Sequence, residues 1–103
     1  MIAIKFSPKY EDRVNIYLRN SNLKIHGIEW DFKEPPGIDD QNHCYWLIDY
    51  KRPRLVNTTL SALREMQKIM GVEDLYFQYC YDLKEFYTQT NKYTGFCIEW
   101  FKV

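Results

Sequence analysis

The chain has 103 residues and no formal net charge, because 14 Lys and Arg balance 14 Asp and Glu. This length predicts one domain, and the balanced charge disfavours a protein that binds nucleic acid mainly by neutralising phosphates. Apolar residues make up 46% and charged residues 27% of the chain, as in an ordinary folded domain. We therefore expect a single compact domain over residues 1–103.

Membrane and secreted classes are also disfavoured. No apolar run reaches the roughly 18 residues of a membrane span, and the polar start of the chain is unlike a secretory signal. The cysteines Cys44, Cys80 and Cys97 lie in apolar segments and form no C-x-x-C pair, which disfavours a zinc ribbon or a thioredoxin-like site. We expect reduced, buried thiols in a cytoplasmic protein.

The first third of the chain predicts strands. Residues 2–6 read IAIKF, a first strand, and residues 7–12 form a turn-rich connection. Residues 14–19 alternate between apolar and polar side chains, which predicts a strand with one buried face. The run 23–32 changes its apolar phase at Gly27, where a β-bulge would keep both sets of apolar residues on the core face.

The middle of the chain predicts a loop and then a strand. Residues 33–43 hold two prolines, a glycine and two adjacent aspartates, which predicts a long exposed loop of the kind that often carries function. Residues 44–51 have apolar side chains at both odd and even positions, so both faces would be apolar, which predicts a central strand.

One helix stands out. Apolar residues recur at helical spacing over residues 57–70, with Leu63 near the centre of the apolar arc. Asn57 or Thr58 is expected to cap its start, and Gly71 to end it.

The last third is dense in aromatic residues. Residues 75–81 and 95–103 predict strands, and residues 91–95 a hairpin turn. Residues 83–90 fit a strand or a short helix, and we favour the strand. Together these segments predict an α+β domain: a mainly antiparallel sheet of about five to seven strands, with one principal amphipathic helix packed on one face.

Histidines offer the main catalytic hypothesis. His26 or His43, acting with Glu29 or Asp31, would suit a small nuclease-like enzyme. His43 and Cys44 are neighbours on a predicted strand and should point to opposite faces, so they do not form a nucleophilic pair.

Common catalytic motifs are missing from the sequence: it contains no GxGxxG, GxxxxGK[ST], GxSxG or HExxH. We therefore predict no catalytic residues, no cofactor and no metal site. Asp39 and Asp40 lack the ligand spacing of a calcium loop, and are expected to solvate their loop or to contact a basic partner.

Cations gather before the helix. Lys51, Arg52 and Arg54 lie close in sequence to two tyrosines and would suit phosphate or an acidic protein surface. Arg64 and Lys68, one helical turn apart, form a small basic ridge or simply a solvated face. The candidate partner-binding residues are Tyr45, Tyr50, Arg52, Arg54, Asp39, Asp40, Arg64 and Lys68.

Aromatic residues make up 17% of the chain, more rings than one small core can hide. Tyr and Trp are frequent anchors at protein interfaces. We therefore predict a non-enzymatic protein-binding module, an inhibitor or immunity-type protein of the kind carried by phages and mobile elements, which blocks a macromolecular partner sterically. The alternatives are a nucleotide- or RNA-binding protein that uses residues 51–54, the nuclease-like enzyme above, and a subunit that only self-associates.

Overall fold

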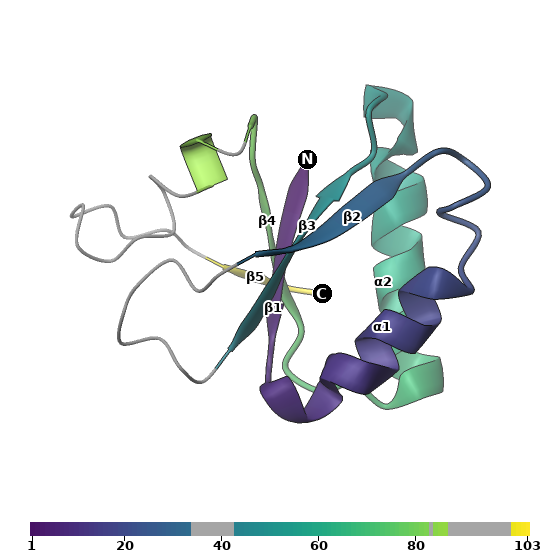
Figure 1. The fold of residues 1–103 in the computed structure, drawn as a ribbon, viewed down its shortest axis with the longest axis vertical. Helices are drawn as coiled ribbons and strands as arrows, with labels where there is room; N and C mark the ends of the chain where they lie inside the picture. Colours follow the sequence, from purple (N-terminus) through teal and green to yellow (C-terminus); the bar gives the residue numbers. More distant parts are fainter. Residues whose placement is uncertain (34–42, 83, 87–99) are drawn as a thin grey trace.

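The described part of the chain folds into a sheet covered by helices on one face. The computed structural model describes residues 1–33, 43–82, 84–86 and 100–103. Within them, five strands form one antiparallel sheet in the order β2-β3-β1-β4-β5 (Figure 1). The strands are β1 (Ile2–Phe6), β2 (Glu29–Lys33), β3 (Cys44–Asp49), β4 (Tyr76–Tyr79) and β5 (Phe101–Lys102).

Helices α1 (Glu11–Arg19) and α2 (Val56–Met70) lie side by side on the same face of the sheet (Figure 1). The predicted α+β class, with its antiparallel sheet, is therefore confirmed. Strand β3 lies between β1 and β2, so the β1-α1-β2 unit is split by a strand that comes later in the chain. This arrangement hosts unrelated activities, and function has to be argued from side chains.

The principal core lies between the sheet and the helices. Strand β1 is central and contributes Ile2, Ile4 and Phe6, all fully buried. Helix α2 contributes Leu63 and Met66, which are also fully buried. The predicted amphipathic helix is confirmed, with its apolar arc facing the sheet.

The start of α2 differs from the prediction. Its N-cap is Leu55, whose side chain makes no capping hydrogen bond, and neither Asn57 nor Thr58 occupies that position. The reason is the short 3₁₀ turn η2 (Pro53–Leu55), which begins at a proline and runs directly into the helix. The predicted end is correct, since Gly71 terminates α2 in the left-handed conformation with φ of 63°.

The segment predicted to be the second strand is helix α1, so that prediction is wrong. Tyr10, Val14 and Leu18 recur every four residues and are buried, whereas Ile16 is 52% exposed. A strand would have placed Val14, Ile16 and Leu18 on the same face. An alternating pattern over only six residues also fits a helix, and this segment folds as one.

The predicted strand 23–32 is correct only near its end, where β2 begins. Residues 23–27 form turns instead, with the Ile28 amide donating to the Leu23 carbonyl at 3.0 Å. Gly27 adopts φ of 76° within these turns, so it is not a bulge in a strand. The apolar pattern changes phase because Leu23 and Ile28, whose side chains are both buried, lie at opposite ends of a turn.

The opposite face of the sheet carries a smaller cluster. Strand β3 turns Tyr45 and Leu47 toward this face, where they pack with Phe86 and the partly buried Trp100. This confirms the expectation that β3 is apolar on both faces.

In the last third, β4 and β5 confirm parts of the predicted strands 75–81 and 95–103. Residues 84–86 are helical, so the alternative of a short helix holds there and the favoured strand does not. The Asp82 carboxylate accepts a hydrogen bond from the Glu85 amide at 2.8 Å. The rest of the predicted strand 83–90, the predicted turn at 91–95 and nearly all of the predicted loop 33–43 lie outside the described residues.

Candidate functional site

The predicted partner-binding residues separate into different places. Tyr50 borders a groove at one end of the sheet, and Arg64 and Lys68 border a second groove over the helices. Arg52 and Arg54 are exposed at the η2 turn. The structure therefore offers two candidate surfaces rather than the single one implied by the sequence.

One predicted contact residue, Tyr45, leaves the candidate surface. Tyr45 is only 2% exposed because its ring packs edge-on against Phe86 and beside Trp100. It supports the sheet and does not present a ring to a partner. Asp39 and Asp40 lie outside the described residues.

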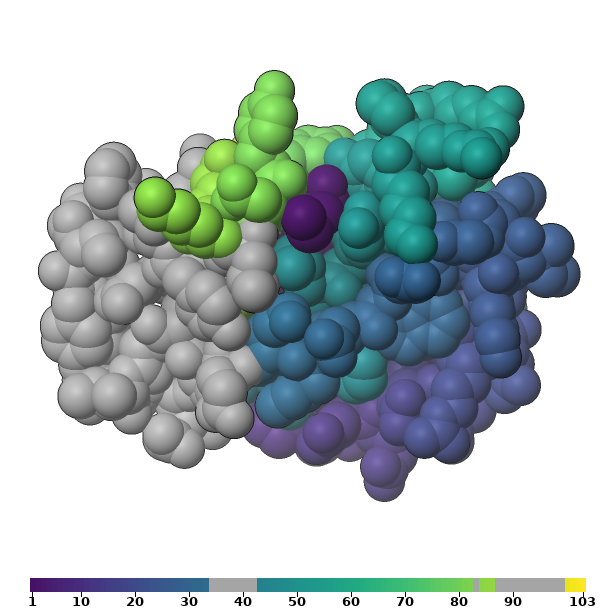
Figure 2. Space-filling model, turned by 45° about the horizontal axis from the view of Figure 1, so that its top comes forward, coloured from purple at the N-terminus to yellow at the C-terminus, as the bar shows by residue number. Residues whose placement is uncertain are grey.

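The first surface is a hollow of about 660 Å³ at the end of the sheet, which we call the tyrosine groove. In Figure 2 the purple N-terminal end of the chain lies between the green segment that follows β4 and the teal segment that follows β3. The residues that line it are Met1, Asp49, Tyr50, Lys51, Pro53, Tyr79, Cys80, Tyr81 and Glu85.

Three tyrosines dominate the tyrosine groove. Tyr81 is 88% exposed and Tyr79 is 48% exposed, although both rings are large. Tyr50 is half-buried, and its pKa is raised by burial and then by the proximity of Tyr79 and Asp49. The three tyrosines present rings with a hydrogen-bonding end.

Lys51 holds one rim of this groove in place. It has a positive φ of 62°, and its amide donates to the Asp49 carboxylate at 2.9 Å. Its ammonium group forms an ion pair with Glu29 of β2 at 3.0 Å. The chain therefore turns sharply at the end of β3 and carries Arg52 outward.

Cys80 lies at the base of the tyrosine groove as a free, buried thiol, and Cys44 is also free and buried. Burial, followed by the negative charge of Glu85, raises the pKa of Cys80 to about 11. A thiol with this pKa is protonated at neutral pH, so it lacks the thiolate that nucleophilic catalysis needs. The third cysteine, Cys97, lies outside the described residues.

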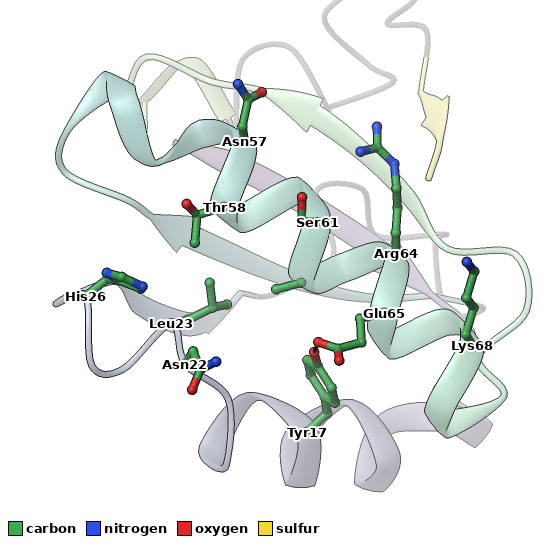
Figure 3. Close-up of a pocket in the computed structure, with 11 residues that line it drawn as sticks. Tyr17, Asn22, Leu23, His26, Asn57, Thr58, Ser61, Arg64, Glu65 and Lys68 are labelled. Carbon is green, nitrogen blue, oxygen red and sulfur yellow. Dashed lines mark hydrogen bonds between the residues drawn. The ribbon is translucent and has the colours of Figure 1, made fainter.

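The second surface is a hollow of about 680 Å³ over α1 and α2, which we call the interhelix groove (Figure 3). The turns at 22–26 close one end of it. The residues that line it are Tyr17, Asn22, Leu23, His26, Asn57, Thr58, Ser61, Ala62, Arg64, Glu65 and Lys68.

A hydrogen bond crosses the interhelix groove. The Tyr17 hydroxyl of α1 donates to the Glu65 carboxylate of α2 at 2.6 Å, and Figure 3 shows the two side chains pointing at each other. The pKa of Tyr17 is raised well above its ordinary value, first by burial and then by this bond. Glu65 is the groove's only carboxylate among the described residues, and the bond engages it.

The predicted combination of histidine and carboxylate does not assemble. His26 is exposed in the turns before β2, while Glu29 pairs with Lys51 and Asp31 pairs with Lys33 at 3.2 Å. His43 packs its ring against Tyr45, on the face opposite Cys44. The latter arrangement agrees with the expectation that His43 and Cys44 do not pair.

Other site chemistry is equally sparse. Among the described residues, no group of three or more His, Cys, Asp or Glu side chains is placed to hold a metal ion. Nor does any helix in that part of the chain have the length and apolarity to cross a membrane.

Comparison with known proteins gives no further guide: no family model, no curated protein and no solved structure matches the chain.

Sequence reasoning missed Tyr79 and Tyr81 as surface residues. Tyr79 is the last residue of β4 and Tyr81 lies just beyond it, although both belong to the segment 75–81 predicted as a strand. Nothing local in the sequence shows where that strand ends in space. The sheet register decides where these tyrosines lie. Ile2 pairs with both Tyr79 and Ile48, so the last residues of β4 and β3 lie at the same end of the sheet.

Proposed function

We propose that this protein is a small binding module that covers part of a partner protein and blocks it sterically, with the tyrosine groove as its contact surface. The observation that carries the proposal is the gathering of Tyr50, Tyr79 and Tyr81 around one hollow, with Tyr81 88% exposed. Large exposed rings are costly in water and are common anchors of protein interfaces.

The surroundings of the groove suit a protein partner. Its rim mixes Asp49, Glu85 and Lys51, while Arg52 and Arg54 are exposed just beyond it. An apolar centre with a charged rim is the usual anatomy of an interface between proteins. A partner would bury roughly 800 Å² on each side. That area is about an eighth of the 6452 Å² surface of this chain.

An inhibitor or immunity-type role agrees with the absence of a catalytic cluster among the described residues. Glu29 and Asp31 are engaged in ion pairs with Lys51 and Lys33, and Cys80 is held as a thiol. Such a protein would act by occupying a surface, and it needs a rigid scaffold rather than reactive groups. Free thiols at Cys44 and Cys80 support a location in the cytoplasm.

The test is capture with matched variants. Tagged wild-type protein, the Tyr79→Ala/Tyr81→Ala variant and an Ile25→Ala control would each be incubated with an extract of the native host. Ile25 is a fair control because it is 81% exposed and lies in the turns before β2. Thermal unfolding would first establish that all three proteins fold alike.

We expect a macromolecule captured near one-to-one by the wild type and by the control, and lost from the double tyrosine variant. Titration calorimetry with the purified partner should then show affinity weakened by at least about tenfold, since anchors of this kind contribute about 2 kcal/mol or more. Equal capture by all three proteins, or a stable self-assembled oligomer with no foreign partner, would overturn the proposal.

A further inference from the structure

Polar and cationic side chains follow one another along the exposed side of α2, and Arg54 precedes them in the turn before the helix. We call this row the basic stripe, and successive members are three or four residues apart, which places them on one side of a helix. Figure 3 shows the four members on α2 projecting from the same side of the helix. The stripe consists of Arg54, Asn57, Ser61, Arg64 and Lys68, all exposed.

Charge is concentrated in this part of the chain. Residues 51–70 hold five of the 14 Lys and Arg residues but only one of the 14 Asp and Glu residues. The one acidic residue is Glu65, whose carboxylate accepts the Tyr17 hydroxyl. A neutral chain therefore carries a cationic segment and an acidic remainder, an asymmetry that favours a polyanionic ligand.

The cations of the stripe are available to a ligand. Within the part of the chain that the structure describes, Arg54, Arg64 and Lys68 form no ion pair, whereas Lys33, Lys51 and Lys102 each do. A ligand would therefore gain these charges without breaking a bridge inside the protein.

We propose that the basic stripe binds the phosphate backbone of a nucleic-acid duplex. From Arg54 to Lys68 the stripe covers 15 residues. Its ends are about 21 Å apart at the helical rise, which matches about six phosphates of one strand. Asn57 and Ser61 lie between the cations, and amide and hydroxyl side chains also donate to phosphate oxygens. This inference goes beyond the proposed protein-binding function and does not depend on it.

The chemistry of the stripe favours a duplex over a single strand. Proteins that hold single strands stack the bases on aromatic rings, and the stripe contains none. The nearest ring in the interhelix groove is Tyr17, which is half-buried and hydrogen-bonded to Glu65. A backbone lying on the stripe would have the adjoining 680 Å³ hollow beside it, with Asn22 and His26 at the far wall.

The test is fluorescence anisotropy with a short labelled DNA duplex. In salt of about 50 mM we expect a dissociation constant of about 10⁻⁶ to 10⁻⁴ M, as for sequence-independent binding. Three phosphate contacts predict a slope of about −3 in log affinity against log salt concentration. A double-stranded RNA of equal length should bind with a similar slope, because the backbone charge is shared.

Matched variants separate the stripe from net charge. Arg64→Gln/Lys68→Gln should weaken duplex binding at least about tenfold and reduce the salt slope by about two. The control Arg19→Gln/Lys24→Gln removes the same charge beside the small hollow at Trp30, and should change the affinity less than about twofold.

Three results would overturn the inference: no binding at low salt, equal losses in the two double variants, or tighter binding to the single strand than to the duplex. The Tyr79→Ala/Tyr81→Ala variant should bind the duplex as the wild type does. This measurement therefore stands whether or not the tyrosine groove binds a protein.

Discussion

The Tyr17 hydroxyl and the Glu65 carboxylate are joined by a 2.6 Å hydrogen bond that ties α1 to α2. The two residues are 48 positions apart in sequence and lie over the outer side of the helical layer. The same two helices are linked a second time at the end of α2, where the Arg13 guanidinium donates to the Met70 carbonyl at 3.3 Å.

Replacing Tyr17 with Phe removes the hydroxyl and keeps the ring. We expect the free energy of unfolding to fall by about 1 kcal/mol, the usual net value of a hydrogen bond that is partly open to water. Urea unfolding of Tyr17→Phe, Glu65→Gln and the double variant would give the coupling energy. Additive effects of the two single changes would show that the bond contributes nothing to stability.

Gly71 ends α2 in a conformation that other residues adopt with difficulty. Its φ of 63° is left-handed, and an added Cβ would lie 3.6 Å from Arg13 Nη1, an ordinary contact. The expected cost of Gly71→Ala is therefore the backbone term alone, about 1 kcal/mol. Thermal or urea unfolding checks this value.

Gly71→Asn serves as the companion variant, because asparagine tolerates the left-handed region better than alanine does. It should lose less stability than Gly71→Ala. If alanine costs nothing, the left-handed end of α2 does not constrain the chain.

Cys80 predicts how stability changes at alkaline pH. Its pKa rises from an ordinary value of 9.0 to about 11 in the folded protein, because burial disfavours the thiolate. Between these values the unfolded chain releases the thiol proton and the folded chain keeps it. The contribution of Cys80 to the free energy of unfolding should therefore be constant below pH 9 and should fall as pH rises toward 11.

The Cys80→Ala variant removes this contribution. Its stability should decline less steeply than that of the wild type over the same interval, as measured by urea unfolding at each pH. Parallel declines in the two proteins would mean that Cys80 ionises as easily in the folded state as in the unfolded one.

The fold class could be predicted from the sequence because the strongest local signals were also the ones that tertiary packing used. The helix over 57–70 has four turns of consistent apolar spacing and a glycine at its end, and it forms as expected. Helix α1 has only nine residues, and its alternating core segment fits both periods. The fully buried Val14 and the exposed Ile16 distinguish the two periods only after the chain has folded.

The candidate sites were less predictable, because both depend on contacts between distant segments. The sequence predicts Tyr50 as a contact residue, but its neighbours Tyr79 and Tyr81 lie at and just beyond the end of β4, which the sheet register brings close. The spacing of Arg64 and Lys68 by itself predicts a ridge. Their continuity with Arg54 depends on η2 running directly into α2, a junction where the sequence predicts a capped helix start.

Leu63 offers the most direct test of how α2 covers the sheet. Its side chain is fully buried in the core formed with β1, so Leu63→Asp would place a carboxylate within a cluster of apolar side chains. We expect a loss of several kcal/mol in the free energy of unfolding, from the lost apolar burial and the unpaired charge together.

The matched control is Ile69→Asp on the same helix, where the side chain is 64% exposed and the cost should stay below about 1 kcal/mol. Urea unfolding of the two variants would compare them directly. If Leu63→Asp fails to fold, the milder variant Leu63→Ala should still cost about 2 to 5 kcal/mol. Equal, small effects at both positions would mean that α2 does not seal the core.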